Sequence, residues 1–456
     1  MMALEIVILA AGQGSRMRSR RPKVLHTLGG KPLLQHVIER ARELRPERIH
    51  VVYGHGGEQV LPLLRQLQVN GVLQAQQLGT GHALLQALPH IDRNSEVLVL
   101  YGDVPLLQPE SLAALSQEAA AGRVALLTFF PPNPHGYGRI VRSGEGDIIA
   151  IVEQREATAE QQRIGEVNSG IIAFAAAPLP NWLGELKNSN AQGEYYLTDL
   201  VALAVAEGVT VVGRAAEDPL SVTGVNDRLQ LQQLERIWQR RQAEKLLQEG
   251  VELADANRID IRGSLRCGQD VSLDVGVIIE GEVTLADGVT VGAYSIIRNS
   301  QIGERVTIEP MSLIESAVIA AECTIGPYAR LRPGTELEQG AKIGNFVEVK
   351  QSTIGRGSKV NHLSYIGDTT MGSEVNIGAG TITCNYDGAN KHQTVIGDRV
   401  FVGSDTQLVA PVEIADGATI GAGSTITKTA PAEALTLSRS RQVTILGWQR
   451  PQKGSK

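Results

Sequence analysis

A glycine-rich segment near the N-terminus contains residue types that suit phosphate chemistry. The string LAAGQGSRM, residues 9–17, follows the apolar run EIVILA, and Pro22 and Lys23 come shortly after it. A glycine turn after a buried strand lets backbone N–H groups approach phosphates closely. Arg16 and Lys23 would add positive charge where a pyrophosphate group develops. The glycines alone are also compatible with a Rossmann-like loop for some other nucleotide.

Asp103 and His362 are two further side chains with a direct chemical use. Asp103, in YGDVP, ends a predicted strand, where a carboxylate can hold Mg²⁺ or simply cap a turn. His362 lies in NHLSY. Histidine is the residue type whose ordinary titration range suits a general base that activates an amine. A single histidine is more often structural than catalytic, so the pattern around it has to decide between the two.

The first half of the chain alternates short apolar runs with amphipathic stretches. Strands are predicted over residues 5–10, 48–54, 96–103, 123–129 and 169–174, and helices over 32–44 and 109–121. This alternation predicts a Rossmann-like α/β domain with a parallel sheet covered on both faces. Ligands bind such sheets at the carboxyl ends of the strands, where Gly12 and Gly14 follow the first one.

The segment 226–250 is predicted to be a linker helix. Apolar residues recur at helical spacing at Leu231, Leu234, Ile237 and Trp238. Asn226 or Asp227 is a suitable cap, and Gly250 is a suitable end. We therefore expect one domain over residues 1–225, the linker helix over 226–250, and a second domain with a C-terminal tail over 251–456.

Beyond the linker an aliphatic residue returns every six positions. One such run is Ile319, Ile325, Leu331, Leu337, Ile343 and Val349, and another is Ile396, Val402, Leu408, Ile414, Ile420 and Ile426. This period predicts a parallel β-helix in which three hexads close a coil and the aliphatic residues fill a narrow core. Gly and small residues are expected at the tight corners.

The hexad pattern slips by one residue at four places, residues 297–302, 314–319, 349–354 and 366–371. A larger break, CNYDGANKHQTV, falls between Thr383 and Ile396. A loop that leaves an otherwise regular coil is where function is expected. The alternative is a β-helix that serves only as a rigid assembly device.

Composition excludes several functional classes. The formal net charge of −6 argues against a nucleic-acid binder, whose surface is basic. No apolar run approaches the roughly 18 residues of a membrane span, and the N-terminus lacks the basic start of a signal peptide. The 3 cysteines are far apart, as expected for reduced thiols in a cytoplasmic protein.

The motifs of the first half resemble the signature of sugar-1-phosphate nucleotidyltransferases. The string LAAGxGxRMxxxxPK is followed by Gln74, by LGTGHA at 78–83, by YGDVP at 101–105, and later by GYGRI, VEQ, NSG, NAQGEYYLTD at 190–199 and GVN. In the second half, RLRPG, GNFVEVK, HLSYIGD, NIGAGTITCNYDG and VGSDTQLVAP follow one another in an order similar to a hexapeptide-repeat acetyltransferase.

Together the two halves resemble, over nearly the whole chain, the bacterial bifunctional N-acetylglucosamine-1-phosphate uridyltransferase/glucosamine-1-phosphate N-acetyltransferase family. The resemblance implies acetyl transfer from acetyl-CoA to glucosamine 1-phosphate. Mg²⁺-dependent transfer of a uridylyl group from UTP to N-acetylglucosamine 1-phosphate would follow. The resulting UDP-N-acetylglucosamine would be used in peptidoglycan and lipopolysaccharide synthesis. It further implies a left-handed coil and a homotrimer with the acetyltransferase site between neighbouring β-helices.

The resemblance also implies a role for individual residues. Catalytic roles fall to His362 as general base and to Arg16 and Lys23 at the phosphates, and Mg²⁺ binding falls to Asp103 and Asn226. Substrates of uridylyl transfer would contact Leu9, Ala10, Ala11, Gly12, Lys23, Gln74, Gly79, Thr80, Tyr101, Gly102, Asp103, Gly138, Glu153, Asn168 and Asn226. Glucosamine 1-phosphate would contact Arg332, Lys350, Tyr365 and Asn376, and acetyl-CoA would contact Ala379, Asn385, Tyr386, Ser404, Ala422 and Arg439.

Two departures and two alternatives accompany this interpretation. Gln13 stands where the family often has Lys, and Asn361 stands where some relatives have Gly. One alternative is a monofunctional nucleotidyltransferase with a structural or regulatory β-helix, for which HLSY and CNYDG would have no use. The other is a non-enzymatic assembly subunit, against which the joint presence of Arg16, Lys23, Asp103 and Asn226 speaks.

Overall fold

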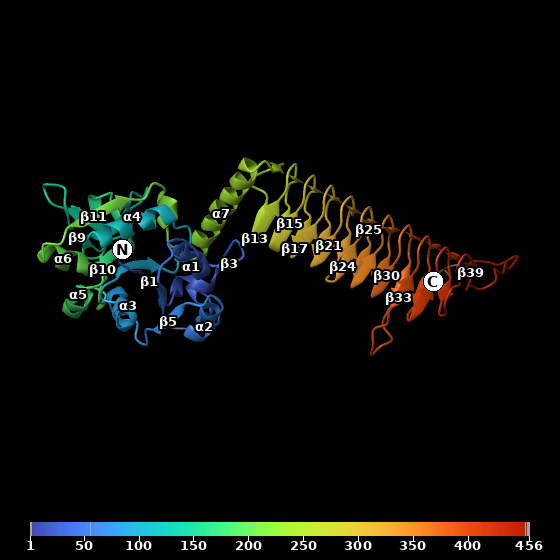
Figure 1. Cartoon of the computed structure of the whole chain (residues 1–456), viewed down its shortest axis with the longest axis horizontal. Coiled ribbons are helices and arrows are strands. Elements are labelled where there is room, and N and C mark those ends of the chain that lie inside the picture. The colour runs from blue at the N-terminus through green and yellow to red at the C-terminus, as the bar shows by residue number, and fades with distance from the viewer. Residues whose placement is uncertain (1, 55, 452, 454–456) are drawn as a thin grey trace. The chain divides into compact units, whose positions relative to one another are not determined.

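The chain divides into two compact units, Met1–Trp238 and Gln239–Lys456. The computed structural model describes residues 2–54, 56–451 and 453, so part of the expected C-terminal tail, 452 and 454–456, lies outside the described residues. The helix predicted over 226–250 is α7 (Arg228–Gln248), and the boundary between the units falls inside it (Figure 1). Asp227 caps α7, since its Oδ1 accepts a 2.9 Å hydrogen bond from the backbone N–H of Gln230.

The first unit is built on a nine-stranded sheet in which seven strands follow the order β11-β7-β10-β6-β1-β4-β5 and a hairpin, β8–β9, attaches to β10. Its strands are β1 (Leu4–Ala10), β4 (Arg48–Tyr53), β5 (Asn70–Leu73), β6 (Glu96–Tyr101), β7 (Val124–Phe129), β8 (Arg139–Arg142), β9 (Ile148–Val152), β10 (Val167–Ala175) and β11 (Val211–Ala215), beside a small pair, β2 (Thr27–Leu28) and β3 (Lys31–Pro32). Its helices are α1 (Leu33–Glu43), α2 (Gly57–Gln66), α3 (Thr80–Ala87), α4 (Pro109–Ala120), α5 (Leu179–Glu185) and α6 (Asp199–Ala206).

Helices cover both faces of this sheet, as the sequence predicts. Successive residues of β1 point to opposite faces, so Val7 packs with Leu84 of α3 and Leu200 of α6 in one core. Ile8 belongs to the other core, with Leu112 of α4. The carboxyl ends of β1 and β6 therefore emerge side by side between two helical layers, which is where the glycine-rich segment begins.

The prediction of a parallel sheet is wrong for one strand. The pairs of β1 with β4 and β6 are parallel, but β10 is antiparallel to both β6 and β7. A parallel neighbour needs a crossover connection, usually a helix. Between β7 and β10 the chain instead forms the antiparallel hairpin β8–β9, so it returns along the sheet in the opposite direction.

The second unit consists of two long sheets whose rungs, wherever strands pair, run parallel. The first sheet contains β12 (Glu252–Leu253), β14 (Ser272–Leu273), β16 (Thr290–Val291), β19 (Thr307–Ile308), β22 (Thr324–Ile325), β25 (Lys342–Asn345), β28 (Lys359–His362), β31 (Asn376–Ile377), β34 (Phe401–Val402), β37 (Thr419–Ile420) and β39 (Leu435–Thr436).

The second sheet runs along the other sides of the coil. It contains β13 (Asp260–Cys267), β15 (Ile278–Leu285), β17 (Ile296–Arg298), β18 (Gln301–Ile302), β20 (Leu313–Glu315), β21 (Ala317–Ile319), β23 (Arg330–Leu331), β24 (Thr335–Leu337), β26 (Glu348–Lys350), β27 (Ser352–Ile354), β29 (Tyr365–Gly367), β30 (Thr369–Met371), β32 (Ile382–Cys384), β33 (Thr394–Ile396), β35 (Gln407–Val409), β36 (Val412–Ile414) and β38 (Thr425–Ile426).

The parallel β-helix predicted from the hexads is confirmed. Each aliphatic residue of the repeat lies above its counterpart one coil away, as Ile297 pairs with Ile314 and Ile314 with Leu331. These side chains are fully buried and form one continuous core. Figure 1 shows the coils stacked in a row, with the strands of each coil beside those of the next.

The four phase slips are corners with one residue fewer. Each short interval contains a residue with left-handed backbone, and these residues are Asn299 (φ 44°), Ser316 (φ 47°), Gln351 (φ 47°) and Asp368 (φ 49°). The coil therefore absorbs the missing residue at a corner and keeps the aliphatic positions facing inwards.

The expectation of glycine and small residues at the corners is wrong for many corners, since charged residues such as Arg305 and Glu322 also take left-handed backbone. One set of corners carries apolar residues. Large apolar residues take the left-handed backbone there, and we call them the apolar ridge: Tyr294 (φ 58°), Met311 (φ 60°), Tyr328 (φ 58°), Phe346 (φ 55°) and Leu363 (φ 47°). Their side chains are 47% to 61% exposed. A left-handed residue other than glycine costs about 1–2 kcal/mol, so backbone preference does not explain this choice of residues.

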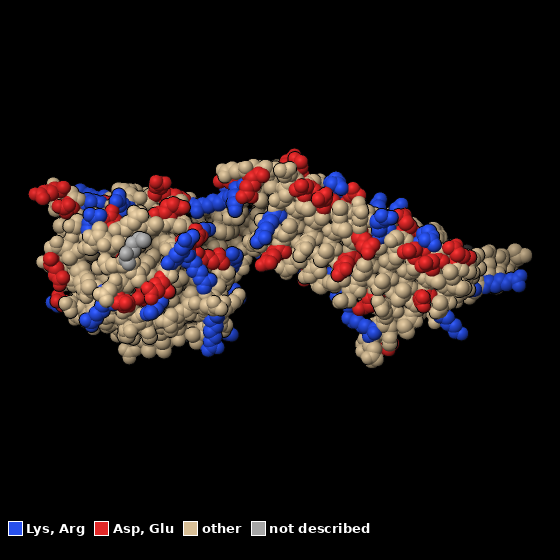
Figure 2. All heavy atoms as spheres, viewed as in Figure 1, with Lys and Arg blue, Asp and Glu red and all other residues tan. Residues whose placement is uncertain are grey.

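The loop predicted between Thr383 and Ile396 is confirmed and leaves the coil between β32 and β33. In Figure 1 it projects from the stack beside β33. None of the helices in the described part of the chain combines the length and apolarity needed to cross a lipid bilayer. Lys and Arg are interspersed with Asp and Glu over the face seen in Figure 2, without one dominant basic surface.

Candidate active sites

A cavity of about 240 Å³ lies at the carboxyl ends of β1 and β6. The glycine-rich segment after β1 forms one wall and the start of α3 another. Its lining residues are Leu9, Ala10, Ala11, Gly12, Lys23, Val24, Gln74, Gln77, Gly79, Thr80, Ala83, Tyr101, Asp103 and Glu194. The structure thus brings together ten of the residues that the resemblance assigns to the nucleotide half.

At this cavity the Asp103 carboxylate and the Asn226 amide oxygen both contact the ammonium group of Lys23. Lys23 Nζ forms an ion pair with the Asp103 carboxylate and donates a 3.4 Å hydrogen bond to Oδ1 of Asn226. Arg16 Nη2 donates to the same amide oxygen at 3.0 Å. The backbone N–H of Val225 donates to the carbonyl oxygen of Asp103 at 2.9 Å, which holds the two segments together.

This donor set suits Mg²⁺. Mg²⁺ keeps several of its waters and takes one or two protein oxygens, which a carboxylate and an amide supply. Because both oxygens already contact one ammonium group, they lie close enough to share a cation. Among the described residues there is no group of three or more His, Cys, Asp or Glu side chains that would offer an alternative metal site.

Gly138, Glu153 and Asn168 form a group beside the cavity rather than in its lining. The backbone N–H of Asn168 donates to the carbonyl oxygen of Gly138 at 2.9 Å. A Cβ on Gly138 would lie 2.9 Å from Ile151 and 3.5 Å from a carboxylate oxygen of Glu153, so only glycine leaves this space open. Gly102 lies in the wall behind, where its N–H donates to the carbonyl oxygen of Leu9.

Burial raises the pKa of Glu153 above its ordinary value, although a 3.1 Å hydrogen bond from Oγ1 of Thr198 opposes this effect. Burial also raises the pKa of the neighbouring Tyr101 hydroxyl, with the negative charge of Glu153 adding to the effect. Tyr101 is therefore neutral in the working pH range and offers a hydroxyl and an aromatic face rather than a charge.

Sequence reasoning missed two polar residues of the cavity, Gln77 and Glu194. Glu194 reaches it because the segment around Tyr195 packs on the start of α3, where the N–H of Gly81 donates to the Tyr195 carbonyl oxygen at 2.8 Å. The motif NAQGEYYLTD was visible in the sequence, but its position against α3 was not.

In the β-helix, His362 and three proposed acetyl-CoA residues occupy equivalent positions of successive coils. Each stands directly before a left-handed corner residue: His362 before Leu363 (φ 47°), Ala379 before Gly380 (φ 77°), Ser404 before Asp405 (φ 56°) and Ala422 before Gly423 (φ 70°). Asn345, before Phe346 (φ 55°), holds the same position one coil earlier than His362. We call these five residues the corner column.

Hydrogen bonds tie the upper part of the corner column together. The N–H of Asp405 donates to the Ala379 carbonyl oxygen and that of Gly423 to the Ser404 carbonyl oxygen, each at 2.8 Å. Arg439, from the segment after the last regular coil, donates through Nη1 to the Ala422 carbonyl oxygen at 2.8 Å. Arg439 therefore lies at the end of the same column.

A second group of proposed substrate residues lies on the other sheet. Lys350 Nζ lies 3.9 Å from Oδ2 of Asp368, and Asn385 of the projecting loop donates to the same carboxylate. Asn385 Nδ2 also lies 3.4 Å from the Tyr365 hydroxyl. Arg332 donates to Glu348 at 2.8 Å.

Asn376 and Tyr386 are placed apart from this network. Asn376 begins β31 and pairs with Lys359 and Phe401, whereas Tyr386 is exposed on the loop and bridges to Lys391. Sequence reasoning missed Lys391, whose pKa is lowered first of all by the neighbouring Lys350 ammonium.

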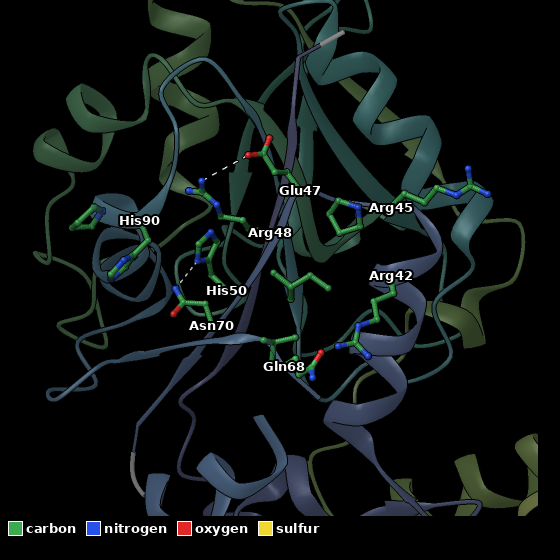
Figure 3. Close-up of a pocket in the computed structure, with 12 residues that line it drawn as sticks. Arg42, Arg45, Glu47, Arg48, His50, Gln68, Asn70 and His90 are labelled. Atoms are coloured by element: carbon green, nitrogen blue, oxygen red, sulfur yellow. Dashed lines mark hydrogen bonds and ion pairs between the residues drawn. The ribbon is translucent and has the colours of Figure 1, made fainter. Parts of the chain in front are cut away.

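A second hollow of the first unit, of about 640 Å³, is elsewhere and lies near the start of β4. Figure 3 shows that Arg42, Arg45 and Arg48 point in different directions around it. Arg42 donates to the Leu67 carbonyl oxygen, and Arg48 lies 3.7 Å from Glu47. These cations therefore do not converge on one group, whereas Lys23 and Arg16 both contact Asn226 Oδ1.

Comparisons with known proteins identify the class of each half of the chain. A family model described as "MobA-like NTP transferase domain" matches residues 6–165, and one described as "Bacterial transferase hexapeptide (six repeats)" matches residues 393–428. The "Bifunctional protein GlmU" of Janthinobacterium sp. (strain Marseille) is 56% identical over 450 residues, 99% of each chain. That of Marinobacter nauticus (strain ATCC 700491 / DSM 11845 / VT8) is 55% identical, covering 99% of this chain and 100% of the relative. That of Nitrosospira multiformis (strain ATCC 25196 / NCIMB 11849 / C 71) is 56% identical, covering 100% and 99%.

Fold and comparisons together define a bifunctional transferase, with a nucleotidyltransferase in its first half and a hexapeptide-repeat acyltransferase in its second. The chain belongs to the family of the bifunctional protein GlmU. It is an enzyme of UDP-N-acetylglucosamine synthesis, and this sugar nucleotide is used in cell-wall synthesis. The monofunctional and non-enzymatic alternatives are therefore wrong.

The raised pKa of Glu153 predicts a pH-dependent stability change on Glu153→Gln. When the pKa of a carboxyl is higher in the folded than in the unfolded chain, the free energy of unfolding falls as the pH rises from the lower pKa to the higher one. The fall is about 1.4 kcal/mol for each pH unit between the two pKa values. Glutamine keeps the acceptor for Thr198 and removes this loss. Below about pH 4 the variant and the wild type should unfold at the same temperature. At pH 8 the variant should unfold at a higher temperature than the wild type.

Thermal unfolding followed by circular dichroism across pH measures this difference, with Glu145→Gln on the exposed β8–β9 turn as the control. Equal melting temperatures of the Glu153 variant and the wild type at pH 8 would show that the carboxylate is not penalised by burial.

Proposed function

We propose that the cavity of the first unit carries uridylyl transfer, with residues 1–225 as its domain and 226–250 as a linker. The observation that supports this most is that the Asp103 carboxylate and the Asn226 amide oxygen both contact the ammonium group of Lys23. Leu9 to Gly12, Gln74, Gly79 and Thr80 would bind the UTP nucleotide. The group formed by Gly138, Glu153 and Asn168 would bind the sugar of N-acetylglucosamine 1-phosphate.

In this reaction a phosphate oxygen of the sugar attacks the α-phosphorus of UTP and pyrophosphate leaves. Such a transfer needs alignment and charge neutralisation rather than a nucleophilic side chain. Lys23 and Arg16 would bind the phosphate oxygens where negative charge builds up. Asp103 and Asn226 would hold Mg²⁺, which supplies the remaining charge neutralisation when it is bound.

Asp103→Ala should reduce uridylyl transfer by at least roughly 100-fold, because it removes the anionic metal ligand and the partner of Lys23. Acetyl transfer should stay unchanged. UTP-dependent pyrophosphate release and acetyl-CoA consumption, measured on the same preparation, test both statements. Asp147→Ala, on the exposed β8–β9 turn, is the matched control, and a normal pyrophosphate rate in Asp103→Ala would refute the metal assignment.

We propose that acetyl transfer takes place along the corner column. The alignment of His362 with Ala379, Ser404 and Ala422 supports this, since acetyl-CoA lying along these coils would bring its thioester towards the histidine. Lys350, Arg332, Tyr365 and Asn376 would bind glucosamine 1-phosphate. Asn385, Tyr386 and Arg439 would contact acetyl-CoA.

The amine of glucosamine 1-phosphate attacks the thioester carbonyl, a C–N bond forms, and the C–S bond to CoA breaks. His362 Nε2 would take the proton from the amine and return it to the CoA thiolate that leaves. An unperturbed tyrosine is too basic for this task and a carboxylate too acidic. No acyl-enzyme is needed, and burial raises the pKa of the Cys384 thiol, which disfavours it as a nucleophile.

His362→Ala should lose acetyl transfer by at least about 100-fold, the lower end of what a general base contributes. Substrate binding and uridylyl transfer should persist. Acetyl-CoA consumption across pH measures the loss, and His90→Ala, at an exposed position of the first unit, controls for loss of a histidine. Acetyl transfer within a few-fold of the wild type would make His362 structural.

We further propose that the enzyme is a homotrimer in which the β-helices pack on one another. The apolar ridge supports this assembly, because five large apolar side chains are exposed in a backbone conformation that disfavours them. Tyr328 and Phe346 stack with ring centroids 5.2 Å apart and form a continuous surface. The ridge leads directly to Leu363, beside His362, so the partner would cover the acetyltransferase site.

Tyr328→Glu combined with Phe346→Glu should therefore lower the molar mass in solution from trimer to monomer. Acetyl transfer should fall with it, while uridylyl transfer persists. Light scattering during size-exclusion chromatography gives the mass, and Glu322→Ala, at a left-handed corner of another column, is the control. A double variant that stays trimeric would show that the ridge lies outside the interface.

A further inference from the structure

His362 makes one side-chain hydrogen bond that the roles proposed above do not use. Its Nδ1 lies 2.7 Å from Oδ1 of Asn345. An amide oxygen only accepts hydrogen bonds, so the imidazole donates through Nδ1–H. In the neutral ring the lone pair is then on Nε2, the nitrogen that points away from Asn345.

The fold holds Asn345 in this place. Asn345 ends β25 and His362 ends β28, and the two are register partners in the parallel sheet. The N–H of Leu363 donates to the Asn345 backbone carbonyl oxygen at 3.1 Å, which fixes the two corners to each other. The amide is thus presented by two rigid coils rather than by a loop.

We infer that Asn345 is a positioning residue for acetyl transfer: it holds the His362 imidazole in the Nδ1–H tautomer with Nε2 directed at the substrate amine. This inference rests on the proposed role of His362 as general base. Asn345 itself would touch neither glucosamine 1-phosphate nor acetyl-CoA. Its effect would reach the reaction only through the histidine ring.

An amide suits this task better than a carboxylate. A base for an amine has to be neutral when the substrate binds, and an anion at 2.7 Å would favour the protonated imidazolium instead. The charged groups on the strands packed around His362 are Lys342 at the start of β25 and Lys359 on β28 itself, while β31 has none. After the adjoining turn, β29 carries Tyr365, and its neighbouring strand β26 carries Glu348, the register partner of Tyr365, and Lys350.

Asn345→Asp and Asn345→Ala separate orientation from charge. Asn345→Ala should lower kcat of acetyl transfer roughly 10- to 100-fold, part of the full contribution of a general base, with both KM values nearly unchanged. Asn345→Asp keeps an acceptor of the same shape, so its kcat should approach the wild type at high pH. Its added charge should move the acidic limb of the pH–rate profile up by about one pH unit.

The double variant Asn345→Ala/His362→Ala tests whether the amide acts through the ring. It should be no slower than His362→Ala alone, because two residues that work as one unit are not additive. Lys342→Ala, at the exposed start of the same strand, controls for disturbance of β25. Uridylyl transfer and the molar mass of each variant report on folding and assembly.

The inference is overturned if Asn345→Ala raises KM without lowering kcat, if the acidic limb of Asn345→Asp stays in place, or if the double variant is slower than His362→Ala by the full factor of Asn345→Ala. These outcomes differ from failure of the base assignment, in which His362→Ala alone would retain acetyl transfer. If Asn345→Ala does not fold, the pH–rate profile of the isosteric Asn345→Asp decides the question.

Discussion

Parallel, in-register stacking of coils is the constraint on which the proposed acetyltransferase site depends. In a parallel β-helix a residue lies directly above the residue one coil earlier, so a chemical group placed at one corner finds its partners at the same corner of the neighbouring coils. Asn345, His362, Ala379, Ser404 and Ala422 all stand before a left-handed corner. The site therefore needs no loop to bring its column together, and the projecting loop adds Asn385 from the side.

The first unit brings its proposed site residues together in a different way. Its site gathers residues that are far apart in the sequence, because the carboxyl ends of β1 and β6 emerge side by side. Asp103 follows β6, while Asn226 comes from the segment before α7 and is brought close by the hydrogen bond between Val225 and Asp103. Lys23 then bridges the two oxygens. Charge pairing, rather than a repeating ladder, defines this site.

Periodicity made much of the fold predictable. The hexads identified the buried column of aliphatic residues, and the apolar runs identified the strands of the first sheet. The antiparallel direction of β10 was not predictable, because a buried strand has the same composition in either direction. The apolar ridge was not expected, since local backbone preference favours glycine at such corners.

Only the residues of the candidate sites that lie in recognisable sequence motifs could be predicted. Lys23, Asp103 and the glycine-rich segment stand in strings whose chemistry is visible in the sequence, and the structure brings them together. Glu194 was missed because it reaches the cavity through a contact between distant segments. Asn345 lies one coil before His362, but the phase slips vary the number of residues per coil, so its register became clear only in the structure.

The most direct test of this account is a crystal structure of the enzyme with glucosamine 1-phosphate and a non-reactive acetyl-CoA analogue. The account predicts that the analogue lies along Ala379, Ser404 and Ala422, with the substrate amine within hydrogen-bond distance of His362 Nε2 and Asn345 still bound to Nδ1. An analogue bound on another side of the coil, or an amine out of reach of Nε2, would contradict the claim that the coil register builds the acetyltransferase site.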